Sequence, residues 1–128
     1  MPENSITTVT VCTTCKRAGW DPERSEATDG EQLLAYVEAA ADCYRDVRIR
    51  THACLMGCDF ACNVSIQADD KIAYAIGTFE PDEESGLAIA EFASLHAQSP
   101  TGQVPYKTWP QAIKGHFRAR ILPLTDGE

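Results

Sequence analysis

Apolar and polar residues follow patterns that predict a strand, a helix and a second strand in the first half of the chain. A β-branched run over residues 6–11 predicts the first strand. Apolar residues recur at helical spacing over residues 33–41, with Asp29 as the expected N-cap and Gln32 as its capping-box partner. Apolar residues and arginines then alternate over residues 47–51, as in a strand. A helix between two strands makes them parallel neighbours through a right-handed crossover.

The second half predicts a hairpin and two further helices. Residues 64–67 and 72–76 alternate as strands, separated by a turn over residues 68–70. An acidic start and an apolar face predict a helix over residues 81–98, and Trp109-Pro110 is expected to open a short last helix. We therefore expect an α/β fold with a four-stranded mixed sheet, βαβ followed by a β-hairpin and a helix. Helices packed against such a sheet make a thioredoxin-like layer.

Length, composition and charge narrow the class of protein. The 128 residues suit one domain spanning residues 1–128, with a mobile tail from about residue 122 to residue 128. The sequence contains neither an apolar run long enough to cross a bilayer nor a secretory leader, so we expect a cytoplasmic protein without a membrane partner. A net charge of −8 argues against nucleic acid and favours a protein partner with a basic docking face.

The cysteines are the strongest chemical signal. Six are many for a chain expected in a reducing compartment, which points to metal, cluster or redox chemistry. Cys12 and Cys15 follow the first strand, and Cys54, Cys58 and Cys62 follow the second at intervals of four. The carboxyl ends of parallel strands lie at one edge of a sheet, so we expect the two groups to converge there.

Converging thiols allow three chemistries. A zinc site favours Cys-x-x-Cys knuckles, and only the first pair has that spacing. Thiol–disulfide exchange favours a helix directly after such a pair, whereas residues 16–28 read as a polar loop. A 2Fe-2S cluster needs four thiolates, two for each iron, which two cysteines from each group supply. Gly57 would let the backbone approach such a cluster closely. The pattern favours the cluster and leaves the other two open.

At these residues the chain resembles the thioredoxin-like 2Fe-2S ferredoxins. The segment Cys54-Leu55-Met56-Gly57-Cys58, followed by alternating Val64 and Ile66, is similar to theirs. Residues 11–17, 54–62 and 104–121 more closely resemble a branch of small bacterial cysteine-rich proteins described as predicted metal-binding proteins. The ferredoxin resemblance implies an electron carrier rather than an enzyme, and a homodimer. It implies a 2Fe-2S cluster held by Cys12, Cys15, Cys54 and Cys58.

Two departures from the ferredoxin pattern keep alternatives open. The first cysteine pair is closer together than in most of those ferredoxins, and Cys62 falls where they often have proline. Cys62 is therefore an alternative cluster ligand, a ligand for a different metal, or a free thiol. One alternative function is delivery of zinc, cobalt or nickel by the same cysteines, Cys62 included, with His52 as a further candidate ligand. Another is thiol–disulfide exchange by Cys12 and Cys15.

The remaining cysteine and two histidines are expected to be structural. Cys43, at the end of the first helix, is expected to be a small buried hydrophobe. His96 and His116 fall in predicted helices, where surface or core positions explain them. The expected role of the protein is electron transfer to, or cluster-dependent support of, a partner oxidoreductase or a metal-cofactor pathway.

Overall fold

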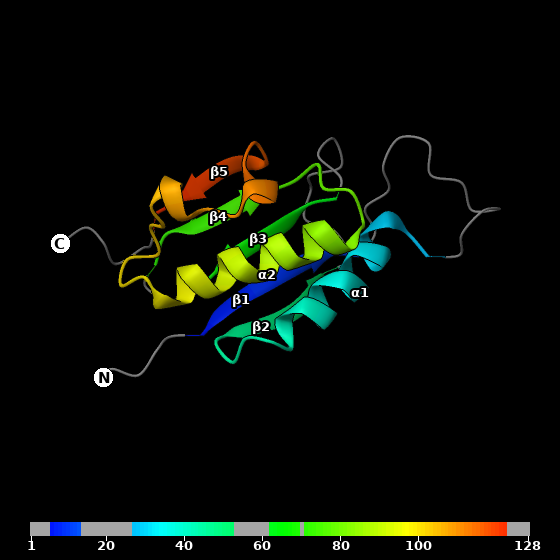
Figure 1. The fold of residues 1–128 in the computed structure, drawn as a ribbon, viewed down its shortest axis with the longest axis horizontal. Helices are drawn as coiled ribbons and strands as arrows, with labels where there is room; N and C mark the ends of the chain where they lie inside the picture. The colour runs from blue at the N-terminus through cyan, green and yellow to red at the C-terminus, as the bar shows by residue number, and fades with distance from the viewer. Residues whose placement is uncertain (1–5, 14–26, 53–61, 70, 123–128) are drawn as a thin grey trace.

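A computed structural model describes residues 6–13, 27–52, 62–69 and 71–122, and Figure 1 shows their arrangement. In chain order the elements are β1 (Thr7–Cys12), α1 (Asp29–Ala41), β2 (Val47–His52), β3 (Val64–Gln67), β4 (Ala73–Ile76), α2 (Glu83–Gln98), the 3-10 turns η2 (Tyr106–Thr108) and η3 (Gln111–Ile113), and β5 (Phe117–Ile121). Apart from residue 122, the predicted tail lies outside the described residues, as do the cysteine-bearing segments 14–26 and 53–61.

The strands form one mixed sheet in the order β2-β1-β3-β4-β5. β1 and β2 are parallel, with Thr7 in register with Val47. β3 runs antiparallel to both β1 and β4. The parallel pair and the hairpin are therefore confirmed, whereas the prediction of four strands is wrong because the described sheet has five.

The fifth strand replaces part of the predicted C-terminal helix. Pro110 precedes only a single 3-10 turn, and Gly115 then adopts a φ of +87°, which interrupts helical geometry. Phe117 packs edge-on against Phe92 of α2 and Tyr74 of β4, with ring centroids 5.2 and 5.3 Å apart. Burying this ring lays residues 117–121 along β4. His116 consequently precedes a strand and does not lie in a helix.

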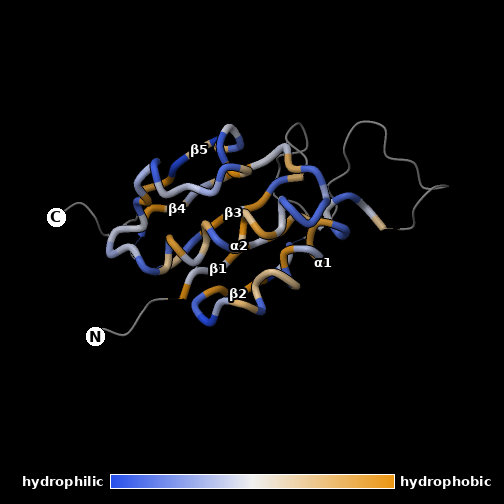
Figure 2. Tube along the Cα trace, in the orientation of Figure 1, coloured by the Kyte–Doolittle hydropathy of each residue, from blue (hydrophilic) through white to orange (hydrophobic). Residues whose placement is uncertain are grey.

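Both described helices cover the same face of the sheet (Figure 1). Both helices and the central strands carry many apolar residues (Figure 2), and the buried ones, among them Val9, Ile66 and Phe92, form one core cluster. The helices approach closely at Gly86, where a Cβ would lie 2.7 Å from the backbone of Tyr36. The largest fully buried side chains in the described residues are Phe79, Phe92, Leu33, Ile66, Ile76, Ile89, Ile113 and His96. Burial of this apolar surface is what holds the layers together.

A polar network fixes the amino end of β1 to the carboxyl end of α2. His96 is fully buried, with Nδ1 2.7 Å from the Thr7 hydroxyl and Nε2 2.6 Å from the Ile72 carbonyl oxygen. A carbonyl can only accept, so Nε2 carries the proton and Nδ1 accepts from Thr7. Lys71 Nζ donates to the carbonyls of His96 and Ala97, and so caps the negative end of α2. Gly102 packs directly against the His96 ring, since a Cβ there would lie 2.9 Å from His96 Nε2.

The buried imidazole should make the protein sensitive to mild acid. Burial, reinforced by the positive charge of Lys71, lowers the pKa of His96 below its ordinary value of 6.5, although the bond to Ile72 acts in the opposite direction. The unfolded chain therefore takes up the proton first as pH falls. The free energy of unfolding should decrease below about pH 6.5, by at most about 1.4 kcal/mol per pH unit from this group.

Urea unfolding between pH 7 and 5 measures this dependence, with His96→Gln as the non-titrating control. The control should be less stable at pH 7, but its stability should fall less steeply with acid. An NMR titration of the His96 ring with an apparent pKa at or above 6.5 would contradict the prediction.

Candidate functional site

The carboxyl ends of β1 and β2 meet at one edge of the sheet, where the two cysteine-bearing segments begin. Cys12 and His52 are in register across the parallel pair. The amide of Thr13 donates to the His52 carbonyl at 3.0 Å, and the amide of Cys12 donates to the Asn63 carbonyl at 3.2 Å. Thr13, His52 and Cys62, which adjoin the two cysteine-bearing segments in the sequence, therefore lie at the same edge of the sheet.

Two of the predicted ligand cysteines lie buried at this edge. Cys12 is 3% exposed and Cys62 is fully buried, and both belong to the core cluster of the protein. Cys62 exchanges backbone hydrogen bonds with Phe79, both 3.4 Å long. The structure therefore brings the last residue of β1 and the end of the second cysteine segment together in an apolar setting. Such a setting controls solvent access to a metal centre.

The amino end of α1 lies against the end of β1. Thr28 is the N-cap and forms a capping box with Glu31, so the predicted cap at Asp29 with Gln32 is wrong by one residue. The Thr28 hydroxyl also donates to the Thr13 carbonyl, which ties this helix end to the strand carrying Cys12. The partial positive charge of a helix amino end favours negative groups such as thiolates nearby.

Three residues at this edge carried no sequence signal for the site. The Phe79 ring stacks on His116, with centroids 4.2 Å apart and planes 9° from parallel. His116 Nδ1 lies 2.9 Å from the Gly77 carbonyl oxygen. Thr78, which links Gly77 to Phe79, has a φ of +62°, a strained value for a β-branched residue. His116 and Phe79 are 37 positions apart in the sequence, so only the pairing of β4 with β5 brings them together.

The other predicted site residues divide into two groups. Cys15, Cys54 and Cys58 lie outside the described residues, so the ligand set remains a prediction. Within the described ranges, no three histidine, cysteine or acidic side chains gather as a metal site. Cys43 is exposed, and the prediction of a buried Cys43 is wrong because the residue follows the end of α1 and its C-cap, Asp42.

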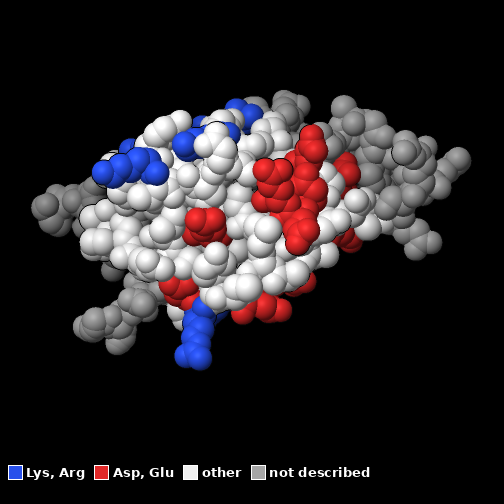
Figure 3. Space-filling model, viewed as in Figure 1, with Lys and Arg blue, Asp and Glu red and all other residues white. Residues whose placement is uncertain are grey.

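Acidic side chains gather near the amino end of α2 (Figure 3). Glu83 and Glu84 lie in its first turn, and Glu91 is exposed two turns later. Together with Leu87, which is 50% exposed, they line a shallow groove between α2 and residues 110–112. β4 is parallel to β1 through two antiparallel steps, so the chain enters α2 from the same sheet edge as Cys12. This acidic surface therefore adjoins the cysteine edge.

Comparisons with known proteins agree with the fold. No curated protein matches the sequence. A solved structure, described as a thioredoxin-like 2Fe-2S ferredoxin from Aquifex aeolicus, superposes with a TM-score of 0.54 at 13% identity, covering 92% of this chain and 94% of that one. This likeness supports the thioredoxin-like fold. No helix in the described ranges has the length and apolar composition needed to cross a bilayer. Over residues 9–123 the sequence matches the family described as "Protein of unknown function (DUF1636)", and the chain belongs to that family.

Proposed function

We propose that this protein binds a 2Fe-2S cluster through Cys12, Cys15, Cys54 and Cys58 and acts as an electron carrier. The observation that carries the proposal is that Cys12 and Cys62, from the two cysteine groups, lie at the same edge of the sheet. Backbone hydrogen bonds from the Cys12 amide to the Asn63 carbonyl and from the Thr13 amide to the His52 carbonyl hold them there. Cys62 stays an alternative ligand.

The described residues suit a cluster in chemical terms. Thiolates are the ligands that iron–sulfur clusters use, and a bound cluster accepts and releases one electron. The amino end of α1, tied to Thr13 by Thr28, would offset part of the negative charge of the ligands. Phe79, fully buried beside Cys62, would keep water from one side of the site.

A partner with a basic face fits the charge of the molecule. Glu83, Glu84 and Glu91 gather beside the proposed site, on a chain whose net charge is −8. Such a surface attracts a basic docking face and speeds encounter. We propose that the partner is an oxidoreductase or a protein of a metal-cofactor pathway and that both act in the cytoplasm. Membership of the bacterial cysteine-rich metal-binding branch, and a homodimer, belong to the same proposal.

A single metal ion is the second candidate, and His52 favours it. His52 is exposed at the edge and in register with Cys12, and Cys62 lies at the same edge. Imidazole and thiolate together suit zinc, cobalt or nickel. This form would hold an ion without acid-labile sulfide and would serve metal delivery.

Anaerobic purification, followed by a visible spectrum and assays of iron and sulfide, tests the proposal. We expect the absorption of a 2Fe-2S cluster with about two irons and two sulfides per chain. A colourless protein holding a stoichiometric ion without sulfide would replace the cluster with the metal-ion function. A metal-free protein that forms a reversible Cys12–Cys15 disulfide would establish thiol–disulfide exchange instead.

A further inference from the structure

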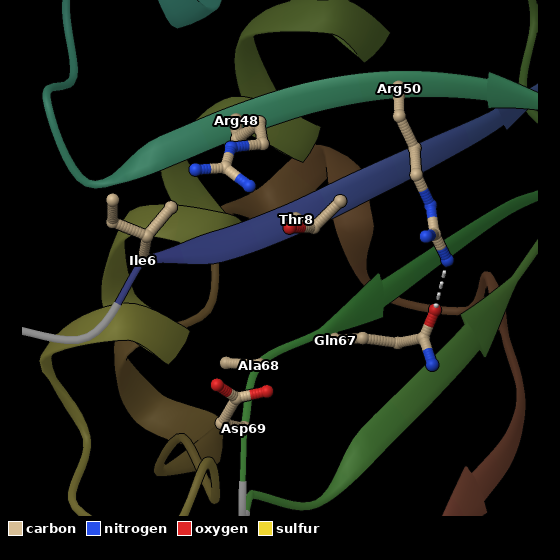
Figure 4. Close-up of a pocket in the computed structure, with 7 residues that line it drawn as sticks. All are labelled: Ile6, Thr8, Arg48, Arg50, Gln67, Ala68 and Asp69. Atoms are coloured by element: carbon tan, nitrogen blue, oxygen red, sulfur yellow. Dashed lines mark hydrogen bonds between the residues drawn. The ribbon is translucent and has the colours of Figure 1, made fainter.

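The face of the sheet opposite the helices carries a groove with two arginines. It has a volume of about 580 Å³ and is lined by Ile6, Thr8, Arg48, Arg50, Gln67, Ala68 and Asp69 (Figure 4). Its residues come from β1 and the position just before it, from β2, and from the end of β3 and the turn after it. The volume falls in the range of small-molecule sites, roughly 300–1,000 Å³.

Arg50 is held in a fixed position across the sheet. Its Nε donates to the Thr10 hydroxyl at 2.6 Å, and its terminal nitrogen donates to Gln67 Oε1 at 3.2 Å. Ser65 donates to the same Gln67 oxygen at 3.3 Å. These partners are neutral, so they orient the guanidinium without cancelling its charge. A guanidinium held in this way loses little side-chain freedom when a ligand binds.

Arg48 and Asp69 complete the charge pattern of the groove. Arg48 reaches over the groove beside Thr8 and Ile6 (Figure 4). Among the described residues, no ion pair joins Asp69 to Arg48 or Arg50. The groove thus carries two positive charges and one negative charge, on a chain whose overall charge is −8. The net negative charge of the whole molecule repels anions, so this local excess of positive charge marks a specific place for one.

We propose that this groove binds a small organic anion, with its carboxylate or phosphate on Arg48 and Arg50. Guanidinium groups bind both oxyanions through paired hydrogen bonds. Asp69 would accept a hydrogen bond from an ammonium or hydroxyl group at the other end of the ligand. The site is independent of the proposed cluster, because none of its lining residues is a candidate ligand.

Titration of ¹⁵N-labelled protein at constant ionic strength tests the site. The probes are ethyl phosphate, phosphoethanolamine and succinate. We expect saturable chemical-shift changes at the amides of Thr8, Arg48 and Gln67. Whichever of ethyl phosphate and succinate binds with the lower Kd identifies the preferred oxyanion. Arg48→Gln should weaken binding of the preferred probe by about tenfold or more. Asp69→Asn should remove any preference for phosphoethanolamine over ethyl phosphate.

Arg45→Gln is the matched control, because Arg45 is exposed and does not line the groove. It removes the same charge and should leave the affinity unchanged. Shifts that fail to saturate with all probes, or equal weakening by Arg45→Gln and Arg48→Gln, would overturn the proposal. A third result would also overturn it: analytical ultracentrifugation shows a dimer, Arg48→Gln dissociates that dimer, and no anion binds. A second copy of the chain would then cover this face.

Discussion

Replacing Cys12 with serine should remove the visible absorption of the protein and its stoichiometric iron and sulfide. Cys12 ends β1, is 3% exposed, and is held at the sheet edge by the hydrogen bond from its amide to the Asn63 carbonyl. A serine hydroxyl is a poor ligand for iron compared with a thiolate. Anaerobic spectra and assays of iron and sulfide on the variant measure the effect.

Cys43→Ser is the matched control for this experiment. Cys43 is exposed after the end of α1, so its variant should keep the full spectrum. Serine at the buried position 12 also costs stability, and circular dichroism of the metal-free forms separates misfolding from loss of a ligand. A folded Cys12→Ser protein with a wild-type complement of iron and sulfide would refute Cys12 as a ligand.

Cys62→Ser decides which cysteines hold the cluster. If Cys15, Cys54 and Cys58 complete the set with Cys12, the Cys62 variant should keep iron and sulfide. Loss of both in a folded Cys62→Ser protein would make Cys62 a ligand in place of one of the four.

Phe92→Ala should destabilise the protein by about 3–5 kcal/mol, a large part of the total for a domain of this kind. Phe92 is fully buried in α2. Its ring meets Tyr74, Trp109 and Phe117 at centroid distances of 5.3, 6.0 and 5.2 Å. Its removal leaves a cavity between α2, β4 and β5 that these rings cannot fill without moving. Urea denaturation measures the free energy of unfolding.

Leu87→Ala is the control in the same helix, because that side chain is 50% exposed. Its cost should be much smaller, and the slope of the urea transition should stay unchanged. Equal losses of stability in the two variants would show that the aromatic cluster does not hold α2 and β5 on the sheet.

Local sequence patterns were sufficient for most of the architecture. The β-branched and alternating segments became β1 and β2, and the helical spacing of apolar residues became α1 and α2, with boundaries within one or two residues. These patterns work because a strand and a helix each present a defined face to the core. The parallel pairing of β1 and β2 then followed from the helix that connects them, because such a crossover returns the chain to the edge where the first strand began.

The errors share a different physical origin. β5 forms because Phe117 packs on rings from α2 and β4, contacts that residues 109–121 do not encode by themselves. The N-cap is Thr28 because its hydroxyl accepts a hydrogen bond from the Glu31 amide and donates one to the distant carbonyl of Thr13. Cys43 is exposed because α1 ends before it. Each outcome depends on a partner far along the chain or on where an element stops.

The sequence by itself determined the order of elements from β1 to α2, the mixed α/β class and the candidate cysteines, since these follow from local periodicity and residue chemistry. Only the tertiary structure decided the fifth strand, the stacking of His116 on Phe79 beside Cys62, and the arginine groove on the open face. Arg48 and Arg50 read in sequence as the polar half of a strand. They become a candidate site because strand pairing places Thr8, Thr10 and Gln67 beside them, and such pairing depends on contacts between distant segments.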